Sequence, residues 1–170
     1  MTEPTGPREL PDLPSKRFEG RNEFRQLVRD ALATAARDGW REIILSDASF
    51  EDWPLGERAV ADSLQAWANG GRKLTLLARR YDEVVRLHAR FVRWRTTWSH
   101  IVTAVGCPSA DAQEIPSAIW SPAWVLERRD PVHCNGYCGS EPERRVLLRE
   151  SLNEWLLKAT PAFPATTLGL

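Results

Sequence analysis

The chain has 170 residues, of which 42% are hydrophobic and 27% are charged. Both fractions are close to the averages of globular domains, and a chain of this length buries about two-thirds of its unfolded surface on folding. The composition therefore argues against a disordered, fibrous or membrane protein. Eight tryptophans are unusual, and we expect most of them in the core because large aromatic side chains are costly to expose.

The amino-terminal segment indicates where the protein resides. Its first twenty residues contain four prolines and lack an apolar run, so neither a signal peptide nor a membrane anchor is predicted. No later stretch approaches the roughly 18 apolar residues that span a bilayer. The three cysteines, Cys107, Cys134 and Cys138, form an odd set, which is typical of reduced thiols in the cytosol. We therefore expect a cytoplasmic protein with no membrane contact.

The formal net charge is zero, but the charges are unevenly distributed along the chain. Residues 1–71 carry 9 basic and 13 acidic side chains, residues 72–100 carry 8 and 2, and residues 101–170 carry 6 and 8. The central segment is therefore strongly basic. Arginine outnumbers lysine 20 to 3, which by itself is not evidence of phosphate recognition.

The first half of the chain alternates predicted helices and strands. A helix capped by Asn22 and ending at Gly39 precedes a buried strand over residues 41–47. A second helix is predicted from about Asp52, with Pro54 in its first turn, to residues 69–71, and is followed by a strand over residues 72–78. Two strands joined by a helix imply a parallel, right-handed crossover.

The central basic segment predicts a third helix from Asp82. Its apolar residues recur at spacings of three and four and define one inward stripe, namely Val84, Leu87, Phe91, Trp94 and Trp98. A third strand is predicted over residues 99–105.

The last third of the chain predicts strands and a hairpin over residues 117–137. Pro116 and Pro122 restrict these strands to a sheet edge or a bulge, and the hairpin turn is either at residues 129–131 or at residues 135–136. A capping box over residues 140–143 then begins an amphipathic closing helix, whose inward residues are Leu148, Leu152, Trp155 and Ala159.

These elements predict a single α/β domain over residues 18–160, with a mixed, mostly parallel sheet flanked by helices. Residues 1–17 are expected to form a flexible leader and residues 161–170 an irregular tail. The sequence shows no internal repeat that would indicate a second domain.

An arginine-rich surface is the main candidate binding site. It comprises side chains around the end of the second strand and on the following helix, namely Arg79, Arg80, Arg86, Arg90 and Arg93. If Trp94 or Trp98 is partly exposed, the same surface could hold phosphates and stack a base. The alternative is a solvated helix face opposite the tryptophan stripe.

A second candidate is a strand-end pocket at Asp47 and Ser49. Open α/β folds bind ligands beyond the carboxyl ends of their parallel strands, where these two residues lie. Asp and Ser after a strand are also ordinary turn residues, because their side chains bond nearby backbone groups.

Metal, nucleophile and cofactor sites have little support in the sequence. His133, Cys134 and Cys138 are three ligand types that zinc accepts, but a fourth ligand is missing nearby, so structural thiols are the simpler interpretation. Cys107 lacks a neighbouring base, and we interpret it as a small loop residue before Pro108. Neither a dinucleotide-binding nor a P-loop glycine pattern occurs, so we predict no catalytic residue, no metal and no cofactor.

The order of the elements resembles one half of the phospholipase D-like fold. Residues 18–20, 41–45, 70–72 and 140–155 are similar to landmarks of that family. The resemblance implies a catalytic His-x-Lys-x4-Asp motif, which is absent from this sequence; its nearest match, His88-Ala-Arg90, has Arg95 at the Asp position and is predicted to be helical. The resemblance therefore implies a degenerate, catalytically silent half, which pairs with itself as two such halves do.

We therefore expect a non-catalytic accessory or regulatory domain, a possible homodimer, that binds nucleic acid or a phosphorylated ligand through the arginine face. One alternative is a phosphodiester-type hydrolase with a non-standard site that uses Asp47, Ser49 and either His100 or His133. Another is a structural protein-interaction module, which would expose an apolar patch with tryptophan.

Overall fold

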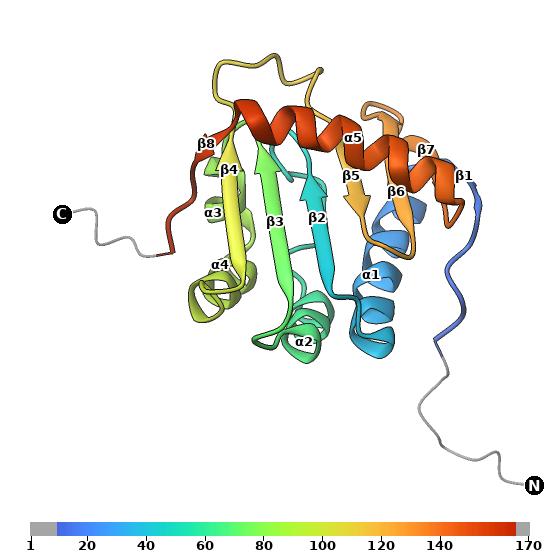
Figure 1. Ribbon diagram of the computed structural model, residues 1–170, viewed down its shortest axis with the longest axis horizontal. Coiled ribbons are helices and arrows are strands. Elements are labelled where there is room, and N and C mark those ends of the chain that lie inside the picture. The colour runs from blue at the N-terminus through green and yellow to red at the C-terminus, as the bar shows by residue number, and fades with distance from the viewer. Residues whose placement is uncertain (1–9, 166–170) are drawn as a thin grey trace, which may run out of the picture.

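The computed structural model describes residues 10–165 and builds them around one eight-stranded sheet (Figure 1). The strands are β1 (Lys16–Phe18), β2 (Glu42–Ser46), β3 (Lys73–Ala78), β4 (Val102–Gly106), β5 (Ser117–Trp120), β6 (Val125–Asp130), β7 (Asn135–Gly139) and β8 (Thr160–Pro161). The helices are α1 (Arg21–Asp38), α2 (Arg58–Trp67), α3 (Asp82–Leu87), α4 (Ala89–Thr97) and α5 (Pro142–Lys158). The strand order is β1-β7-β6-β5-β2-β3-β4-β8.

The sheet confirms the predicted α/β class, but the prediction that it is mostly parallel is wrong. Only β2 with β3 and β3 with β4 pair in parallel, as the helical crossovers α2 and α3–α4 require. The five other strand pairs are antiparallel. Short turns join β5 to β6 and β6 to β7, and such turns reverse the chain direction.

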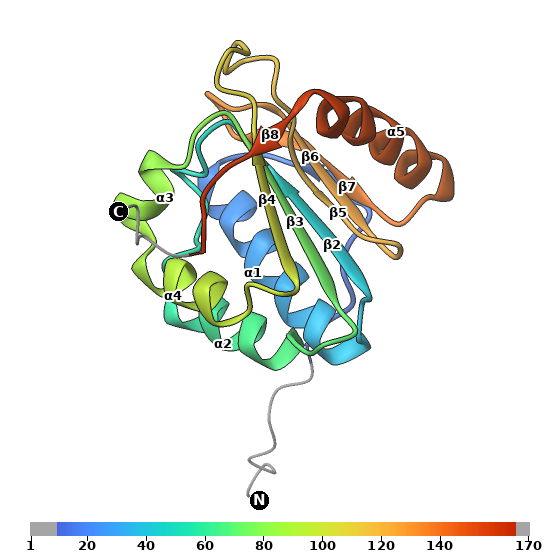
Figure 2. The ribbon, with the colours of Figure 1, turned by 60° about the vertical axis from the view of Figure 1, so that its left-hand side comes forward.

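The helices cover the two faces of the sheet unequally. Helices α1 to α4 pack on one face, while α5 alone crosses the other (Figure 2). The larger core lies under α1 to α4, and the smaller core under α5 contains Ile44, Leu77, Leu148 and Leu152. None of the helices described over residues 10–165 is long and apolar enough to cross a membrane.

Two helix starts differ from the sequence predictions. Helix α1 begins at Arg21 after Gly20, so Asn22 lies inside the helix and does not cap it, although Gly39 ends the helix in the left-handed conformation as expected. Helix α2 begins only at Arg58. The preceding turns instead bury Phe50, Trp53 and Leu55 in the core, and this packing outweighs the helix-start signal of Pro54.

The predicted third helix is divided at His88 into α3 and α4. The imidazole of His88 is buried, and its Nε2 donates a hydrogen bond to the carbonyl oxygen of Phe50 at 2.8 Å. His88 therefore takes the inward position that the helical stripe assigned to Leu87, which is 42% exposed.

The carboxyl-terminal strands resolve the alternatives for the hairpin. Residues 131–134 form the turn between β6 and β7, close to the first alternative, while Asn135 and Gly136 belong to β7. Strand β5 lies between β2 and β6, so the edge alternative for Pro116 and Pro122 is wrong for this strand, and the register shift in this part of the sheet lies between Arg128 and Asp130 of β6, away from both prolines. The two prolines lie just outside β5, so their missing amide hydrogens do not interrupt the hydrogen bonds of β5 with β2 and β6.

Helix α5 begins at Pro142 after Glu141, without a side-chain cap, so the predicted capping box does not form. Leu148 and Leu152 are buried as expected, whereas Trp155 is half-buried and Ala159 follows the helix.

Both ends of the described chain pair with the sheet. Strand β1 begins inside the expected leader and pairs with β7, and β8 pairs with β4 at the start of the expected tail. The remainder of these expectations, residues 1–9 and 166–170, lies outside the described residues. The prediction that most tryptophans are core residues is confirmed, because five are buried and the other three, Trp98, Trp120 and Trp155, are half-buried.

Candidate anion-binding site

The carboxyl ends of β2, β3 and β4 bring the sequence candidates Ser49, Arg79 and Arg80 to one edge of the sheet. These residues line a hollow of about 360 Å³, together with Glu51, Asp82 and Glu83. The backbone amides of Arg79 and Arg80 donate to the carbonyl of Ala48, which holds the two segments together. This hollow combines two cations with a hydroxyl group, the side-chain types that bind phosphate oxygens, but carboxylates also line it.

Arg79 and Arg80 differ in how their side chains are held. The Nε of Arg79 donates to the carbonyl of Ala110 at 2.9 Å, so its guanidinium is oriented by the β4–β5 loop. Arg80 is exposed, and its guanidinium has no hydrogen-bond or ion-pair partner among residues 10–165. A free guanidinium beside an oriented one leaves donors available for an incoming anion.

The other three arginines of the predicted surface lie on the outer helices and do not line the hollow. Arg86 on α3 is paired with Glu83, which reduces its net charge. Arg90 on α4 donates to the carbonyl of Gly56 at 2.9 Å, and the guanidinium of the exposed Arg93 has no partner in the described part of the chain. Arg90 and Arg93 are three residues apart and share one face of α4.

Neither predicted stacking tryptophan forms an open surface beside these arginines. Trp94 is 5% exposed and packs against Phe91, while Trp98 is half-buried and donates to the Gln65 side chain at 3.0 Å. Trp94 is therefore unavailable for stacking, because the inward stripe of α4 carries it into the core, and of the two tryptophans considered only Trp98 is partly exposed.

Asp47, the second candidate at the end of β2, points into the protein. Its carboxylate accepts hydrogen bonds from the amides of Ser49 and Phe50, which is the turn geometry considered as the alternative interpretation. Its other oxygen accepts from Arg128 Nη2 at 2.9 Å. Asp47 is only 5% exposed and is not a lining residue of the hollow.

Arg128 is the centre of a buried polar cluster. Its guanidinium, 2% exposed, donates to Asp47, to Asp52 at 2.6 Å and to the Ser117 hydroxyl at 3.0 Å. One guanidinium nitrogen also lies 3.4 Å from the Sγ of Cys134, and the ring of Phe24 lies 4.4 Å below the group.

The guanidinium of Arg128 compensates part of the negative charge of this cluster. Burial acts to lower the pKa of Arg128, but the neighbouring carboxylates of Asp47 and Asp52 outweigh it, so its pKa is raised. Two carboxylates therefore share one permanently charged guanidinium, and their strongest acceptor sites are occupied. This arrangement stabilises the junction of β2, β5 and β6 and leaves Asp47 without an approach to solvent.

The three residues considered for zinc do not converge. His133 is exposed and its Nδ1 lies 2.7 Å from Asp130, whereas Cys134 faces the Arg128 cluster and Cys138 faces the carbonyls of Pro14 and Lys16. Within residues 10–165, no group of three or more His, Cys, Asp or Glu side chains is arranged to hold a metal ion.

The remaining histidine and cysteine candidates also lie apart. His100 is exposed and packs against the Trp98 ring. Cys107 is buried beyond the end of β4, where burial raises the pKa of its thiol. A raised pKa disfavours the thiolate, which is the nucleophilic form.

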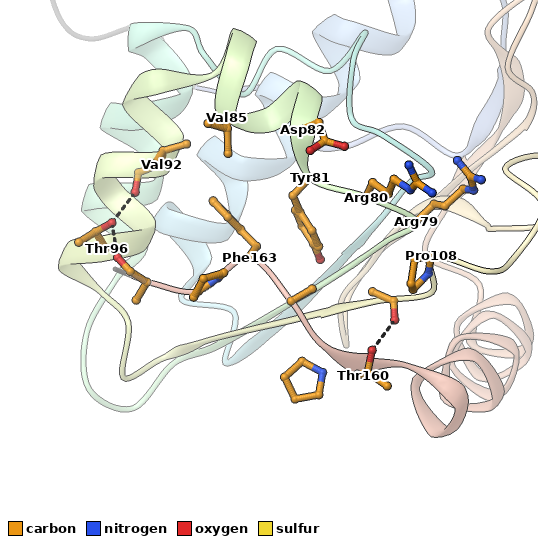
Figure 3. A pocket seen from close by; sticks show the side chains of 15 residues that line it. Arg79, Arg80, Tyr81, Asp82, Val85, Val92, Thr96, Pro108, Thr160 and Phe163 are labelled. Carbon is orange, nitrogen blue, oxygen red and sulfur yellow. Dashed lines mark hydrogen bonds between the residues drawn. The ribbon is translucent and has the colours of Figure 1, made fainter. Parts of the chain in front are cut away.

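A larger hollow of about 950 Å³ lies beside the first one, and Arg79 and Arg80 line both. Its walls come from the ends of β3 and β4, from α3 and α4, and from residues 160–165 (Figure 3). Most of the lining is apolar, including Tyr81, Val85, Val92 and Phe163. The hollow thus joins an apolar chamber to a cationic rim.

Sequence reasoning missed three residues that shape these sites. Arg128 shares the buried face of β6 with Leu126, and Arg95 follows Phe91 by four residues on the inward side of α4. Tyr81 was not singled out, although it directly follows the arginine pair. The period of two along β6 and the spacing of four along α4 are the sequence signals that indicate buried positions for Arg128 and Arg95.

Comparison with models of known protein families and with curated proteins gives no match. Among solved structures, the chain is similar to TrmBL2, described as an archaeal chromatin protein with a novel mode of DNA binding. The TM-score is 0.60 at 14% identity over 87% of this chain and 54% of that one, so the chain spans about half of TrmBL2. NucT from Helicobacter pylori gives a TM-score of 0.57 at 10% identity over 87% of this chain and 98% of that one. At these identities the likeness shows a shared fold.

Proposed function

We propose that this chain is a non-catalytic accessory domain that binds nucleic acid through the arginines at the carboxyl edge of its sheet. The observation that carries the proposal is the pair Arg79 and Arg80, which lines both hollows at this edge and includes a guanidinium without an internal partner. Phosphate oxygens are the anions that arginine donors match best in geometry.

The extent of the cationic surface favours a polymer over a small phosphorylated ligand. Arg90 and Arg93 lie on α4, outside the residues that line the hollow, and the Arg93 side chain is exposed. A strand of nucleic acid presents a phosphate at each nucleotide and can contact several separated arginines at once. The fold shared with TrmBL2, whose description is of DNA binding, supports the same partner class.

The buried cluster supports the absence of catalysis. The resemblance to phospholipase D-like proteins, with which the structural likenesses are compatible, implies catalytic residues on the strands of this region. Here the region holds Arg128 bonded to the buried Asp47 and Ser117 and to the half-buried Asp52. Because these side chains bond to one another, none of them presents a free nucleophile or proton donor to solvent.

The test is fluorescence anisotropy with labelled single-stranded and duplex DNA and RNA of about 20 nucleotides at about 50 mM salt. The double variant Arg79→Glu, Arg80→Glu should lose affinity by on the order of tenfold or more. The matched control is Arg41→Glu, Lys73→Glu, which makes the same charge change at the amino ends of β2 and β3, where both side chains are exposed.

A second double variant, Arg80→Glu with Arg93→Glu, leaves the Arg79 hydrogen bond to Ala110 intact and separates loss of charge from loss of structure. Wild-type protein that binds none of the nucleic acids at low salt would refute the proposal. Equal losses from the edge variants and from the Arg41, Lys73 control would also refute it, because they would indicate a general charge effect.

We also propose that a homodimer can form through α5. Val146 and Leu147 are adjacent on this helix and are 56% and 65% exposed, and contiguous exposed apolar side chains mark protein–protein interaction sites. Light scattering should then give twice the monomer mass for wild type and the monomer mass for Leu147→Glu. A monomeric wild type at all concentrations would contradict this part and leave nucleic-acid binding unaffected.

A further inference from the structure

Residues 160–165 cross the larger hollow and place Phe163 against Tyr81 (Figure 3). The two rings are stacked, with centroids 5.0 Å apart and an angle of 16° between the planes. The Tyr81 hydroxyl donates to the carbonyl of Val105 at 2.6 Å, which fixes the tyrosine ring at the end of β3. Tyr81 is therefore a firm aromatic surface with a second ring lying parallel to it.

Arg95 meets the same phenylalanine from α4. Its Nε donates to the carbonyl oxygen of Phe163 at 3.2 Å, and its guanidinium lies 5.6 Å from the Phe163 ring centroid. Arg95 is 6% exposed, yet no carboxylate among residues 10–165 pairs with it, and its buried Nη1 has no hydrogen-bond partner. A buried guanidinium without an anion is unusual, because the cost of desolvating a charge is normally offset by pairing.

The segment that covers Arg95 is attached by a short strand pairing, by the Ala162 amide, which donates to the carbonyl of Ala104 at 3.1 Å, and by the buried Phe163 ring. Strand β8 has two residues, one of them Pro161, which has no amide hydrogen to donate. Phe163 itself has a φ of 47°, in the left-handed region that side chains other than glycine, asparagine and aspartate rarely adopt. The Thr96 hydroxyl donates to the carbonyl of Ala165 at 2.9 Å, farther along the segment.

We propose that Tyr81 and Arg95 form a nucleotide pocket that residues 160–165 occupy from within the same chain. The Phe163 ring lies where a base would stack on Tyr81, and the Phe163 carbonyl lies where a phosphate oxygen would accept from Arg95. Displacing the segment frees an aromatic face and an unpaired buried cation, which together match a base carrying a phosphate.

The neighbouring arginines indicate how a bound nucleic-acid strand would continue beyond the pocket. Arg79 and Arg80 line the same hollow as Tyr81, so phosphates adjacent to the stacked nucleotide would reach them. The pocket therefore deepens the proposed function and rests on it where the ligand is a nucleic-acid strand. A free mononucleotide offers the same chemistry from a second source, and the experiment separates the two.

The first test removes the internal ring. Phe163→Ala should bind a 5′-phosphorylated oligothymidylate of about 12 nucleotides at least about fivefold more tightly than wild type, because the competing ring is gone. Adding Arg95→Gln should abolish this gain. Pro164→Ala, at an exposed neighbouring position, is the matched control and should behave as wild type.

The second test holds the segment in place without changing Phe163. A Cβ at position 106 would lie 3.2 Å from the Cβ of Ala162, near the spacing of about 3.5 to 4.5 Å found in disulfides. Oxidised Gly106→Cys, Ala162→Cys should bind the oligonucleotide at least about fivefold more weakly than the same protein after reduction. Mass spectrometry would establish the bond, and the melting temperature would establish the fold.

The outcomes separate the pocket from the proposed function. If wild type binds the oligonucleotide but Phe163→Ala and the locked variant do not change the affinity, the pocket is refuted and the arginine surface stands. If thymidine monophosphate binds Phe163→Ala, and no nucleic acid binds any variant, the pocket stands and the proposed function fails. If neither probe binds any variant, both are refuted.

Discussion

The Nη2 of Arg128 lies 2.9 Å from the Oδ1 of Asp47, inside the junction where β2, β5 and β6 meet. Both side chains are buried, and Asp47 comes from the position at which an open α/β sheet presents its ligand-binding residues. The ion pair therefore holds the acidic residue that follows β2 in the core. The polar side chains that remain at this edge are the arginine pair that follows β3 and its neighbours Ser49, Glu51, Asp82 and Glu83.

The first prediction concerns the stability of this pair. Replacing Arg128 by methionine leaves Asp47 and Asp52 without their cation, and breaking a buried ion pair in this way costs about 3 to 5 kcal/mol. Urea denaturation should show this loss for Arg128→Met. Arg129→Met, a change at the exposed neighbouring position, should stay within about 0.5 kcal/mol of wild type. An Arg128→Met variant as stable as wild type would show that the cluster does not hold the fold together.

The second prediction concerns catalysis. Because Asp47 is bonded to Arg128 and to two backbone amides, we expect no hydrolysis of phosphodiester or phosphomonoester substrates, with or without divalent metal ions. A broad substrate screen measures this directly. Activity that Asp47→Ala abolishes, while the fold persists, would establish the hydrolase alternative.

The third prediction concerns pH. Burial lowers the pKa of His88 below its ordinary value of 6.5, so the unfolded chain takes up a proton at a higher pH than the folded chain does. Stability should therefore be constant above about pH 7 and should fall as the pH drops below 6.5 towards the folded pKa.

Urea midpoints measured at about pH 7.5 and pH 5.5 should differ more for wild type than for His88→Gln. Glutamine can still donate to the Phe50 carbonyl but does not titrate in this range. An identical pH dependence of both proteins would show that His88 does not control it.

The fourth prediction concerns Gly136 in β7, opposite Phe18 and Arg128. A Cβ at this position would overlap the carbonyl oxygen of Glu127 and lie 2.7 Å from the Phe18 ring. Gly136→Ala should lower the free energy of unfolding by about 1 to 3 kcal/mol, as overpacking does. Gly70→Ala has open space around its Cβ and serves as the control, for which thermal melting should show little change. Comparable melting of the two variants would contradict the close packing of β1 on β7.

Local patterns were sufficient to predict the parallel half of the fold. Strands β2, β3 and β4 are buried apolar runs between helices, and short-range periodicity reports burial of this kind directly. The pairing of β5 beside β2 is a contact across about seventy residues, as the hydrogen bond from Ser46 to the carbonyl of Pro116 shows. No local pattern specifies such a contact. The sequence prediction therefore placed the antiparallel strands at the wrong position in the sheet.

The candidate sites illustrate the same limit. The basic character of residues 79–93 was visible in the composition, but the partners that the fold supplies decide which guanidinium groups are free. Glu83, three residues away, pairs with Arg86, and Gly56, 34 residues away, accepts from Arg90. The Arg80 guanidinium has no partner within residues 10–165. Arg128 and Arg95 were missed as site residues because arginine is seldom buried. Their positions on inward faces were the available signal.

The salt dependence of nucleic-acid binding is the measurement that tests the central claim most directly. The slope of log affinity against log salt counts the phosphates that the protein neutralises, at about 0.7 per contact for a single strand and 0.9 for a duplex. We predict that Arg80→Ala with Arg93→Ala reduces the magnitude of the slope by about 1.4 on single strands, while Arg41→Ala with Lys73→Ala leaves it unchanged. An unchanged slope in the Arg80, Arg93 variant, with binding intact, would place the nucleic acid elsewhere and contradict the account.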